Sequence, residues 1–260
     1  MFATVLATEF LKLRRSKVTW GTLAVFSIAP LAIALFMWIV REPGRARGLG
    51  LLGTKAQLSG LEATWPSYLS MLTLVVGMGG MLLLAFVIAY VFGREYAEGT
   101  AKNLLALPVA RHWIVLAKFV VAAVWWLALV AAVVAEGLVV GLALALPGFS
   151  PGLLAGAVRD VALVAAAAYL LVPPVAWITV LGRGYMPPIG FALATLALGD
   201  VFSHTGWAAW FPWSILPLFV GAVGARQTAI GAGSVVVVAL TFIAGIAATI
   251  TQLRYADNVQ

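Results

Sequence analysis

The chain has 260 residues, of which 63% are hydrophobic and only 10% are charged, and its mean hydropathy is +1.07. Soluble domains are about 45–50% apolar and about 25% charged, so this composition excludes an ordinary soluble protein. The net charge is +7, but the sixteen Lys and Arg residues are scattered along the chain, which favours basic residues at a membrane surface over a nucleic-acid partner.

Several long apolar segments recur along the sequence. A run of about 18 or more apolar residues can cross ~30 Å of hydrocarbon as a helix. Helix is the default there because the backbone must satisfy its own hydrogen bonds. We therefore expect an all-α polytopic membrane protein with one transmembrane domain over residues 1–260. The six expected spans are residues 20–40, 68–92, 119–146, 161–182, 185–202 and 227–253.

Residues 1–19 are predicted to form an amphipathic helix that lies at the membrane interface and leads into the first span. Apolar residues recur there at helical spacing, and basic residues gather behind them. The alternative is a solvated basic tail. The apolar residues are Phe2, Leu6, Phe10 and Leu13, and the basic ones are Lys12, Arg14, Arg15 and Lys17.

Basic residues also indicate the orientation of the chain. The four before the first span place the N-terminus in the cytoplasm by the positive-inside rule. With six spans the C-terminus lies there too, and cytoplasmic segments then hold ten of the sixteen Lys and Arg residues. Arg45, Arg47 and Lys55 in the first external connection run against this orientation.

The most polar stretch of the chain is the loop of residues 94–112, which lies between two apolar segments. Its charged residues stand at spacings that allow pairing along a helix, Gly99-Thr100 permits a bend, and leucines follow. Exposed leucines flanked by charges suggest a docking surface for a partner protein. A solvated loop whose leucines dip into lipid explains the same residues. They are Arg94, Glu95, Glu98, Gly99, Thr100, Lys102, Leu104, Leu105, Pro108 and Arg111.

Glu136 lies well inside the third span, beside Gly137 and Gly141. A carboxylate within a membrane helix is costly and is a functional candidate by default. The glycines allow close packing of a second helix. A neutral glutamate bonded across helices, or one nearer the outer water, is the alternative to a place on the substrate pathway.

Residues 204–225 are predicted to form an extracellular re-entrant hairpin before the last span. The segment is uncharged up to Arg226, but its tryptophans favour the interface and its prolines interrupt helices. A full crossing is the alternative. Asp200, Trp210 and Trp213 are further candidates for the substrate pathway, and Asp200 with His204 makes only a weak metal site, so no metal is expected.

The central loop resembles the cytoplasmic loop of permease subunits in the ABC-2-type family of ABC transporters. The family pattern is an acidic residue, Gly-Thr, a Leu pair, Pro-Val-x-Arg and a lysine at the next span. Ala110 departs from the Ser or Thr that usually precedes the arginine. The matching residues here are Glu95, Gly99-Thr100, Leu104-Leu105, Pro108-Val109, Arg111 and Lys118; Glu9-x-x-Lys12 and the Trp/Pro-rich hairpin also look familial.

The resemblance implies six spans, an N-terminal connecting helix and a coupling helix in the central loop that sits in a groove of a separate ATP-binding subunit. It also implies a dimer of permeases with two ATPase subunits in a bacterial cell membrane, with a smaller contact at Arg183. ATP and Mg would bind the ATPase, and this chain would bind no cofactor. The segment WFPWSILP looks most like the peptide-antibiotic or lantibiotic immunity branch of the family.

The expected function is therefore that of an exporter subunit that moves an amphipathic substrate such as a peptide antibiotic, drug or lipid. The chain is not expected to be an enzyme, since no G-x-x-x-x-G-K-[ST] phosphate loop occurs in it. Two alternatives are an intramembrane enzyme and a structural subunit of a non-ABC membrane complex. The enzyme would need converging polar residues within the spans, and the structural subunit leaves the loop pattern unexplained.

Overall fold

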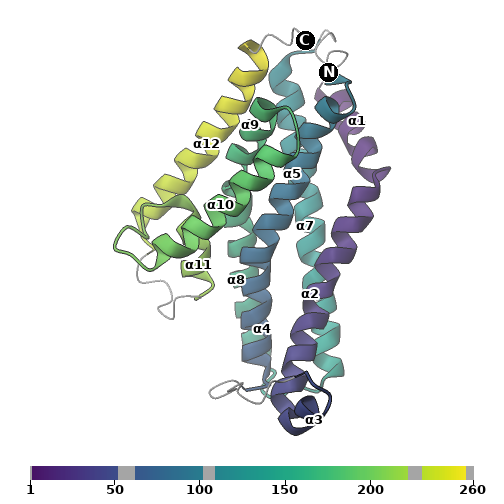
Figure 1. The fold of residues 1–260 in the computed structure, drawn as a ribbon, viewed down its shortest axis with the longest axis vertical. Helices are drawn as coiled ribbons and strands as arrows, with labels where there is room; N and C mark the ends of the chain where they lie inside the picture. Colours follow the sequence, from purple (N-terminus) through teal and green to yellow (C-terminus); the bar gives the residue numbers. More distant parts are fainter. Residues whose placement is uncertain (1, 52–61, 102–108, 222–229, 256–260) are drawn as a thin grey trace.

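A computed structural model describes residues 2–51, 62–101, 109–221 and 230–255, and within these ranges helices, joined by turns and short irregular segments, are the only regular secondary structure (Figure 1). Six helical segments are long and apolar enough to cross a membrane, which confirms the expected all-α protein with six such helices. They are Lys17–Arg41, Trp65–Ala97, Arg111–Ala143, Pro151–Gly182, Met186–Ser203 and Ala232–Tyr255.

Both ends of the described chain lie at the same end of the bundle (Figure 1). We call this the terminal end. Helix α1 (Phe2–Arg14) packs mainly against α7 (Arg111–Ala143). It ends earlier than the predicted helix over 1–19, because Ser16 starts a new helix: its hydroxyl accepts a hydrogen bond from the Val18 N–H at 3.0 Å. Helix α2 (Lys17–Arg41) then runs to the opposite end, where the short α3 (Pro43–Gly48) lies.

The second long helical segment runs through the middle of the molecule. It consists of α4 (Trp65–Leu74), a π-helical turn η1 (Val75–Gly79) and α5 (Gly80–Ala97). Helix α5 contacts α2, α7, α8, α9 and α10, and Leu84 and Ile88 on it have no exposed surface. Movement of α5 would therefore change the packing of most helices in the bundle.

The fourth segment is broken by two prolines. Helix α8 (Pro151–Leu170) ends where Pro173-Pro174 begins α9 (Pro173–Gly182). Helix α12 (Ala232–Tyr255) crosses this break closely, since a Cβ on Gly245 would lie 2.6 Å from the Pro174 backbone nitrogen. Glycine is therefore needed at the crossing.

Helix α10 (Met186–Ser203) leads into the segment predicted as a hairpin. The described part of residues 204–225 forms turns, a 3₁₀ turn η2 (Pro212–Ser214) and the five-residue helix α11 (Ile215–Phe219). Neither short helix is long enough to cross a membrane. Helix α11 packs against α10, α8 and η1, so the segment folds back onto the bundle. Its re-entry into lipid stays a prediction.

Candidate functional site

Two acidic and two basic side chains meet at the terminal end of the bundle. We call them the charge cluster: Glu9 and Lys12 from α1, Glu95 from α5 and Lys118 from α7. The Lys118 Nζ lies 3.1 Å from Glu9 Oε2 and 2.7 Å from Glu95 Oε1. The Lys12 Nζ lies 2.7 Å from Glu9 Oε1 and 3.2 Å from Glu95 Oε1. Each carboxylate therefore contacts both ammonium groups.

Most of the charge cluster is shielded from solvent. Glu9, Glu95 and Lys118 are only 5%, 7% and 3% exposed. Buried charges are costly unless they are paired and hydrogen-bonded. Lys118 meets this condition fully, because its third hydrogen bond goes to the Val91 carbonyl at 2.7 Å. The four residues thus hold α1, α5 and α7 in one arrangement.

Lys12 stays charged in this environment. Burial lowers the pKa of Lys12, but hydrogen bonding to Glu9 and the negative charges of Glu9 and Glu95 outweigh burial, so the pKa lies above its ordinary value. A raised lysine pKa stabilises the fold below the unfolded-state value and loses this effect only as the pH rises through the folded value. The contribution of Lys12 to the charge cluster is therefore present near neutral pH.

The charge cluster is joined directly to the start of the central loop. Helix α5 ends at Ala97, and Gly99 adopts a left-handed conformation with φ of +67°. The Thr100 N–H donates to the Glu95 carbonyl at 2.8 Å, and the Gly99 N–H donates to the Tyr96 carbonyl at 3.2 Å. These two bonds form a Schellman motif, which explains the glycine. Glu95 thus holds the charge cluster by its side chain and the loop by its backbone.

The position of Glu95 differs from the prediction. The sequence suggested that the water-exposed loop begins at Arg94, but α5 continues through Ala97 and turns Glu95 inward. The predicted pairing at helical spacing is present in its neighbours: Arg94 Nε lies 2.7 Å from Glu98 Oε1, and Glu98 is half exposed. Arg94 also lies over the Tyr90 ring at 5.9 Å. The exposed charge at the loop entrance is therefore Glu98.

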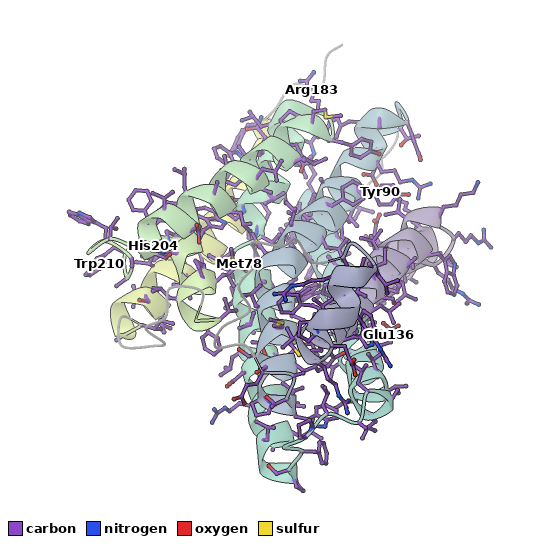
Figure 2. The ribbon with its side chains drawn as sticks, turned by 60° about the horizontal axis from the view of Figure 1, so that its bottom comes forward. Met78, Tyr90, Glu136, Arg183, His204 and Trp210 are labelled. Atoms are coloured by element: carbon purple, nitrogen blue, oxygen red, sulfur yellow. The ribbon has the colours of Figure 1, made fainter. Side chains whose placement is uncertain are left out.

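The far end of the loop contacts the last helix. Arg111 begins α7, and its Nη1 donates to the Leu253 carbonyl and, at 3.0 Å, to the Arg254 carbonyl in the last turn of α12. A cation is favoured at that position because carbonyls at a helix C-terminus are unpaired and carry partial negative charge. Arg183 occupies a left-handed turn after α9 at the terminal end (Figure 2). Lys102, Leu104, Leu105 and Pro108 lie outside the described residues.

The candidates for a substrate pathway do not converge. Figure 2 shows Glu136 on one side of the molecule and His204 and Trp210 on the other. Trp210 is 62% exposed at a turn, whereas Trp213 is half-buried and packs edge-on against Phe191. Asp200 is exposed near the end of α10. Among the described residues, no three His, Cys, Asp or Glu side chains form a group that could hold a metal ion.

Glu136 joins two helices inside the bundle. The Ser27 hydroxyl of α2 donates to Glu136 Oε1 at 2.8 Å, while Glu136 Oε2 is buried without a hydrogen-bond partner in the described part of the chain. The adjacent glycine allows close packing as predicted, because a Cβ on Gly137 would lie 2.9 Å from Leu72. Glu136 thus occupies a costly position, and its place on a pathway stays a prediction.

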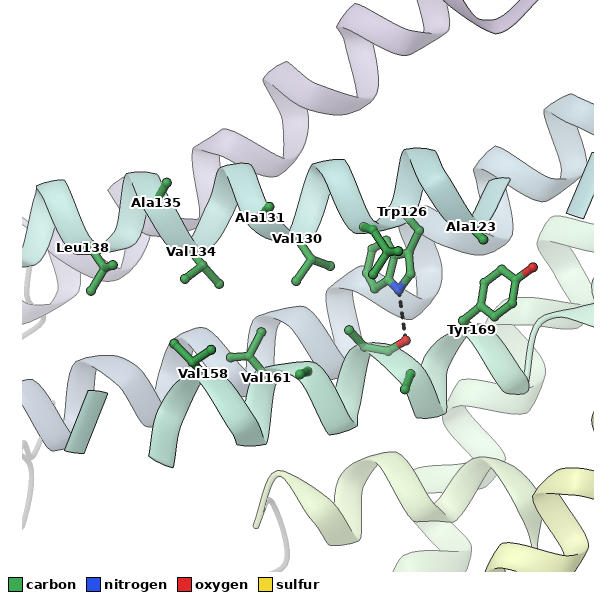
Figure 3. Close-up of a pocket in the computed structure, with 14 residues that line it drawn as sticks. Ala123, Trp126, Val130, Ala131, Val134, Ala135, Leu138, Val158, Val161 and Tyr169 are labelled. Atoms are coloured by element: carbon green, nitrogen blue, oxygen red, sulfur yellow. Dashed lines mark hydrogen bonds between the residues drawn. The ribbon is translucent and has the colours of Figure 1, made fainter. Parts of the chain in front are cut away.

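An apolar groove of about 600 Å³ runs between α7 and α8 (Figure 3). Val130, Val134 and Leu138 line it on α7, with Val158 and Val161 opposite on α8. Near one end the Trp126 Nε1 donates to the Ala165 carbonyl at 2.9 Å and ties the two helices together. The lining of the groove is almost entirely apolar.

Sequence reasoning did not name Glu9, Lys12 and Lys118 as site residues. Two signals pointed to them: the i,i+3 spacing of Glu9 and Lys12, and a lysine at the start of an otherwise uncharged span. No spacing rule connects Glu9 with Lys118, since they are 109 residues apart in the chain.

Two comparisons with known proteins bear on this site. Residues 5–199 match a family model described as "ABC-2 family transporter protein". The chain is also 30% identical over 183 residues to the "Bacitracin transport permease protein BCRB" of Bacillus licheniformis, an alignment that covers 70% of this chain and 88% of the relative. No solved structure matches the chain. The family match includes the whole charge cluster and the central loop.

Proposed function

Because the chain belongs to the ABC-2 family of transporter proteins, we propose that it is the permease of an exporter in which a separate ATPase drives the bundle through the central loop. Members of this family are transmembrane subunits without an ATPase domain, and they work with ATPase subunits. Family membership therefore decides against the intramembrane enzyme and the non-ABC structural subunit. ATP and Mg belong to the partner, and the permease itself binds no cofactor.

The charge cluster is the observation that carries this proposal. It connects the two ends of the loop, since Glu95 lies at the end of α5 and Lys118 lies two turns into α7. It also includes α1 through Glu9 and Lys12. A buried network with every ammonium paired resists separation, because leaving one charge unpaired is strongly unfavourable. A force applied to the loop is therefore transmitted to three helices together.

For ATP to change the conformation, the loop must bind the two nucleotide states of the ATPase with different affinity. Glu98 and Arg94 at the loop entrance, the loop leucines and Arg183 at the neighbouring turn are proposed to make this contact. We propose that the terminal end faces the cytoplasm, that α1 lies at the membrane interface as the connecting helix, and that residues 204–225 form the extracellular re-entrant hairpin. Two permeases and two ATPases would form the working transporter.

An amphipathic molecule is the proposed cargo, exported or extracted from the membrane. The relative is named as a bacitracin transport permease. A peptide antibiotic is therefore the first substrate to test, with drugs and lipids next. The apolar groove between α7 and α8 supports an amphipathic cargo or a lipid contact, since its lining is apolar. We propose that Glu136 contacts polar groups of the substrate along its pathway and that Trp210 and Trp213 contact the substrate at the membrane interface.

The docking role can be tested by reversing the exposed charge at the loop entrance. We expect Glu98→Lys to lower the amount of ATPase that co-purifies with the permease and to abolish substrate-stimulated ATP hydrolysis. The matched control is Arg45→Glu, an exposed charge at the other end of the bundle that pairs with Glu42. Both variants should insert into the membrane normally. Unchanged ATPase recovery and stimulation in Glu98→Lys would contradict the docking role.

A further inference from the structure

A second cleft, with polar walls, lies between α4, α8 and the end of α11. Its volume is about 680 Å³. Ser67, Ser70 and Thr73 line it on α4, Gly156 and Asp160 line it on α8, and Val220 lies beyond α11. The first residue of α4 contacts the connection that precedes α8, since the Trp65 N–H donates to the Pro147 carbonyl at 3.0 Å. We call it the Asp160 cleft.

The sequence creates both the polarity and the space of this cleft. Ser67, Ser70 and Thr73 are spaced by three residues, so they share one face of α4. Gly152 and Gly156 are spaced by four residues on α8, and a Cβ on either would meet no atom within 4 Å. These glycines are therefore not needed for helix packing; they leave the cleft open.

The depth of the cleft places Asp160 near the edge of the hydrocarbon layer. Helices α8 and α9 together have 32 residues and would span about 48 Å, which exceeds a ~30 Å hydrocarbon layer by some 18 Å. Asp160 is nine residues after Pro151, or about 13 Å along the helix. A bilayer centred on the helix would therefore leave the mouth of the cleft among the headgroups and Asp160 just inside.

Asp160 keeps acceptor capacity for a ligand. Its Oδ1 accepts from Arg159 Nε and Nη2 at 3.3 and 3.2 Å. The Arg159 side chain is 72% exposed, and an exposed pair of this kind contributes little free energy. A ligand cation can therefore replace it. The Thr73 hydroxyl donates to the Leu69 carbonyl at 2.9 Å, which leaves its oxygen to accept.

We infer that the Asp160 cleft binds the ammonium or guanidinium head of a cationic amphipathic molecule. An ammonium group would be held by the Asp160 carboxylate and by the hydroxyl oxygen of either Ser67 or Thr73, which lie about 9 Å apart along α4. An anionic head would be repelled by the carboxylate. The apolar part of the molecule would stay in the lipid next to the cleft. This inference rests on the proposed transport function and specifies the class of its substrate.

Binding can be measured without nucleotide, on the permease–ATPase complex in phosphatidylcholine nanodiscs. The probes are two dansyl-labelled molecules with the same alkyl chain, one ending in a primary ammonium and the other in a hydroxyl group. Binding to empty nanodiscs is subtracted. We expect Asp160→Asn to weaken binding of the ammonium probe roughly tenfold or more, because a hydrogen bond to a charged group is lost. Binding of the hydroxyl probe should not change. Glu42→Gln, at another partly exposed acid that pairs with an exposed arginine, is the matched control.

A second variant tests whether the ligand needs the open volume of the cleft. Gly156→Leu should fill it and weaken the ammonium probe, whereas Gly190→Leu, at another helical glycine with open space around its Cβ, should not. Equal affinity of wild type and both cleft variants for the ammonium probe, or preference of the wild type for the hydroxyl probe, would overturn the inference.

Two sources of the ammonium group can be separated in the same assay. Competition by phosphatidylethanolamine added to the nanodiscs would identify a lipid headgroup as the ligand, and its failure to compete would exclude that headgroup and favour a transported substrate. The proposed function is judged separately by recovery of the ATPase. Failure of the wild-type protein to bind the ammonium probe, with normal recovery of the ATPase, refutes the cleft alone. Normal probe binding by a wild-type permease that recovers no ATPase refutes the transporter assignment alone.

Discussion

Lys118 is the residue on which the charge cluster depends most. It is 3% exposed and bonds to two carboxylates and one carbonyl. We expect Lys118→Met to destabilise the protein by about 3–5 kcal/mol, because Glu9 and Glu95 are left buried with one ammonium between them. Thermal unfolding in detergent measures this.

Lys17→Met serves as the control for this prediction, since Lys17 is exposed, and should change stability by less than about 0.5 kcal/mol. The double variant Glu95→Gln, Lys118→Met restores the balance of charge, so we expect it to be more stable than the single Lys118→Met variant. Equal stability of Lys118→Met and Lys17→Met would show that the charge cluster does not hold the helices together.

Glu95 shows at the residue scale what sequence could and could not predict. Its charge and its place before Gly99-Thr100 were readable as a motif, and the pairing of Arg94 with Glu98 followed from helical spacing. Its burial did not follow, because the last turn of α5 is set by tertiary contacts with α1 and α7. Helix ends are uncertain by one or two residues in any case. A shift of that size separates an exposed acid from a buried one.

At the scale of elements, the end of α5 is defined by the left-handed Gly99. An alanine there would meet no atom within 4 Å of its Cβ, so its cost is purely that of the backbone. We expect Gly99→Ala to destabilise the turn at the loop entrance by roughly 1–2 kcal/mol. It should also reduce the amount of ATPase that co-purifies with the permease. Gly99→Asn should behave more like wild type, since asparagine tolerates this conformation. Identical behaviour of the two variants would remove the Schellman turn from the coupling path.

The long helices were the most predictable elements. Four of the six spans were expected within five residues at both ends, because continuous apolar runs leave little choice of structure. The third and fourth spans begin earlier than predicted, at Arg111 and Pro151. Two features were not predicted from the sequence: the π-helical turn Val75–Gly79 and the helix break at Ser16. The Asp160 cleft was not predicted either. Its serines and its carboxylate lie about 90 residues apart and meet only when α4 packs against α8.

At the scale of the whole molecule, the proposed orientation can be tested directly because the chain contains no cysteine. In intact cells we expect a membrane-impermeant maleimide to label Arg45→Cys at once and Glu98→Cys only after the membrane is permeabilised. Both positions are exposed or half exposed and lie at opposite ends of the bundle. Labelling of Glu98→Cys in intact cells would reverse the orientation and rule out a cytoplasmic ATPase at this loop.

The arrangement around the first two turns of α7 has a consequence for biosynthesis. Arg111 holds the last turn of α12, and Lys118, about 10 Å further along the same helix, holds α1. Helices α12 and α1, which lie far apart in the sequence, are thus fastened to neighbouring turns of one helix. A nascent chain cannot complete this closure before Arg254 has emerged. Under the proposed coupling, a force on the loop therefore reaches both α1 and α12 only after α12 has been synthesised and has packed against α7.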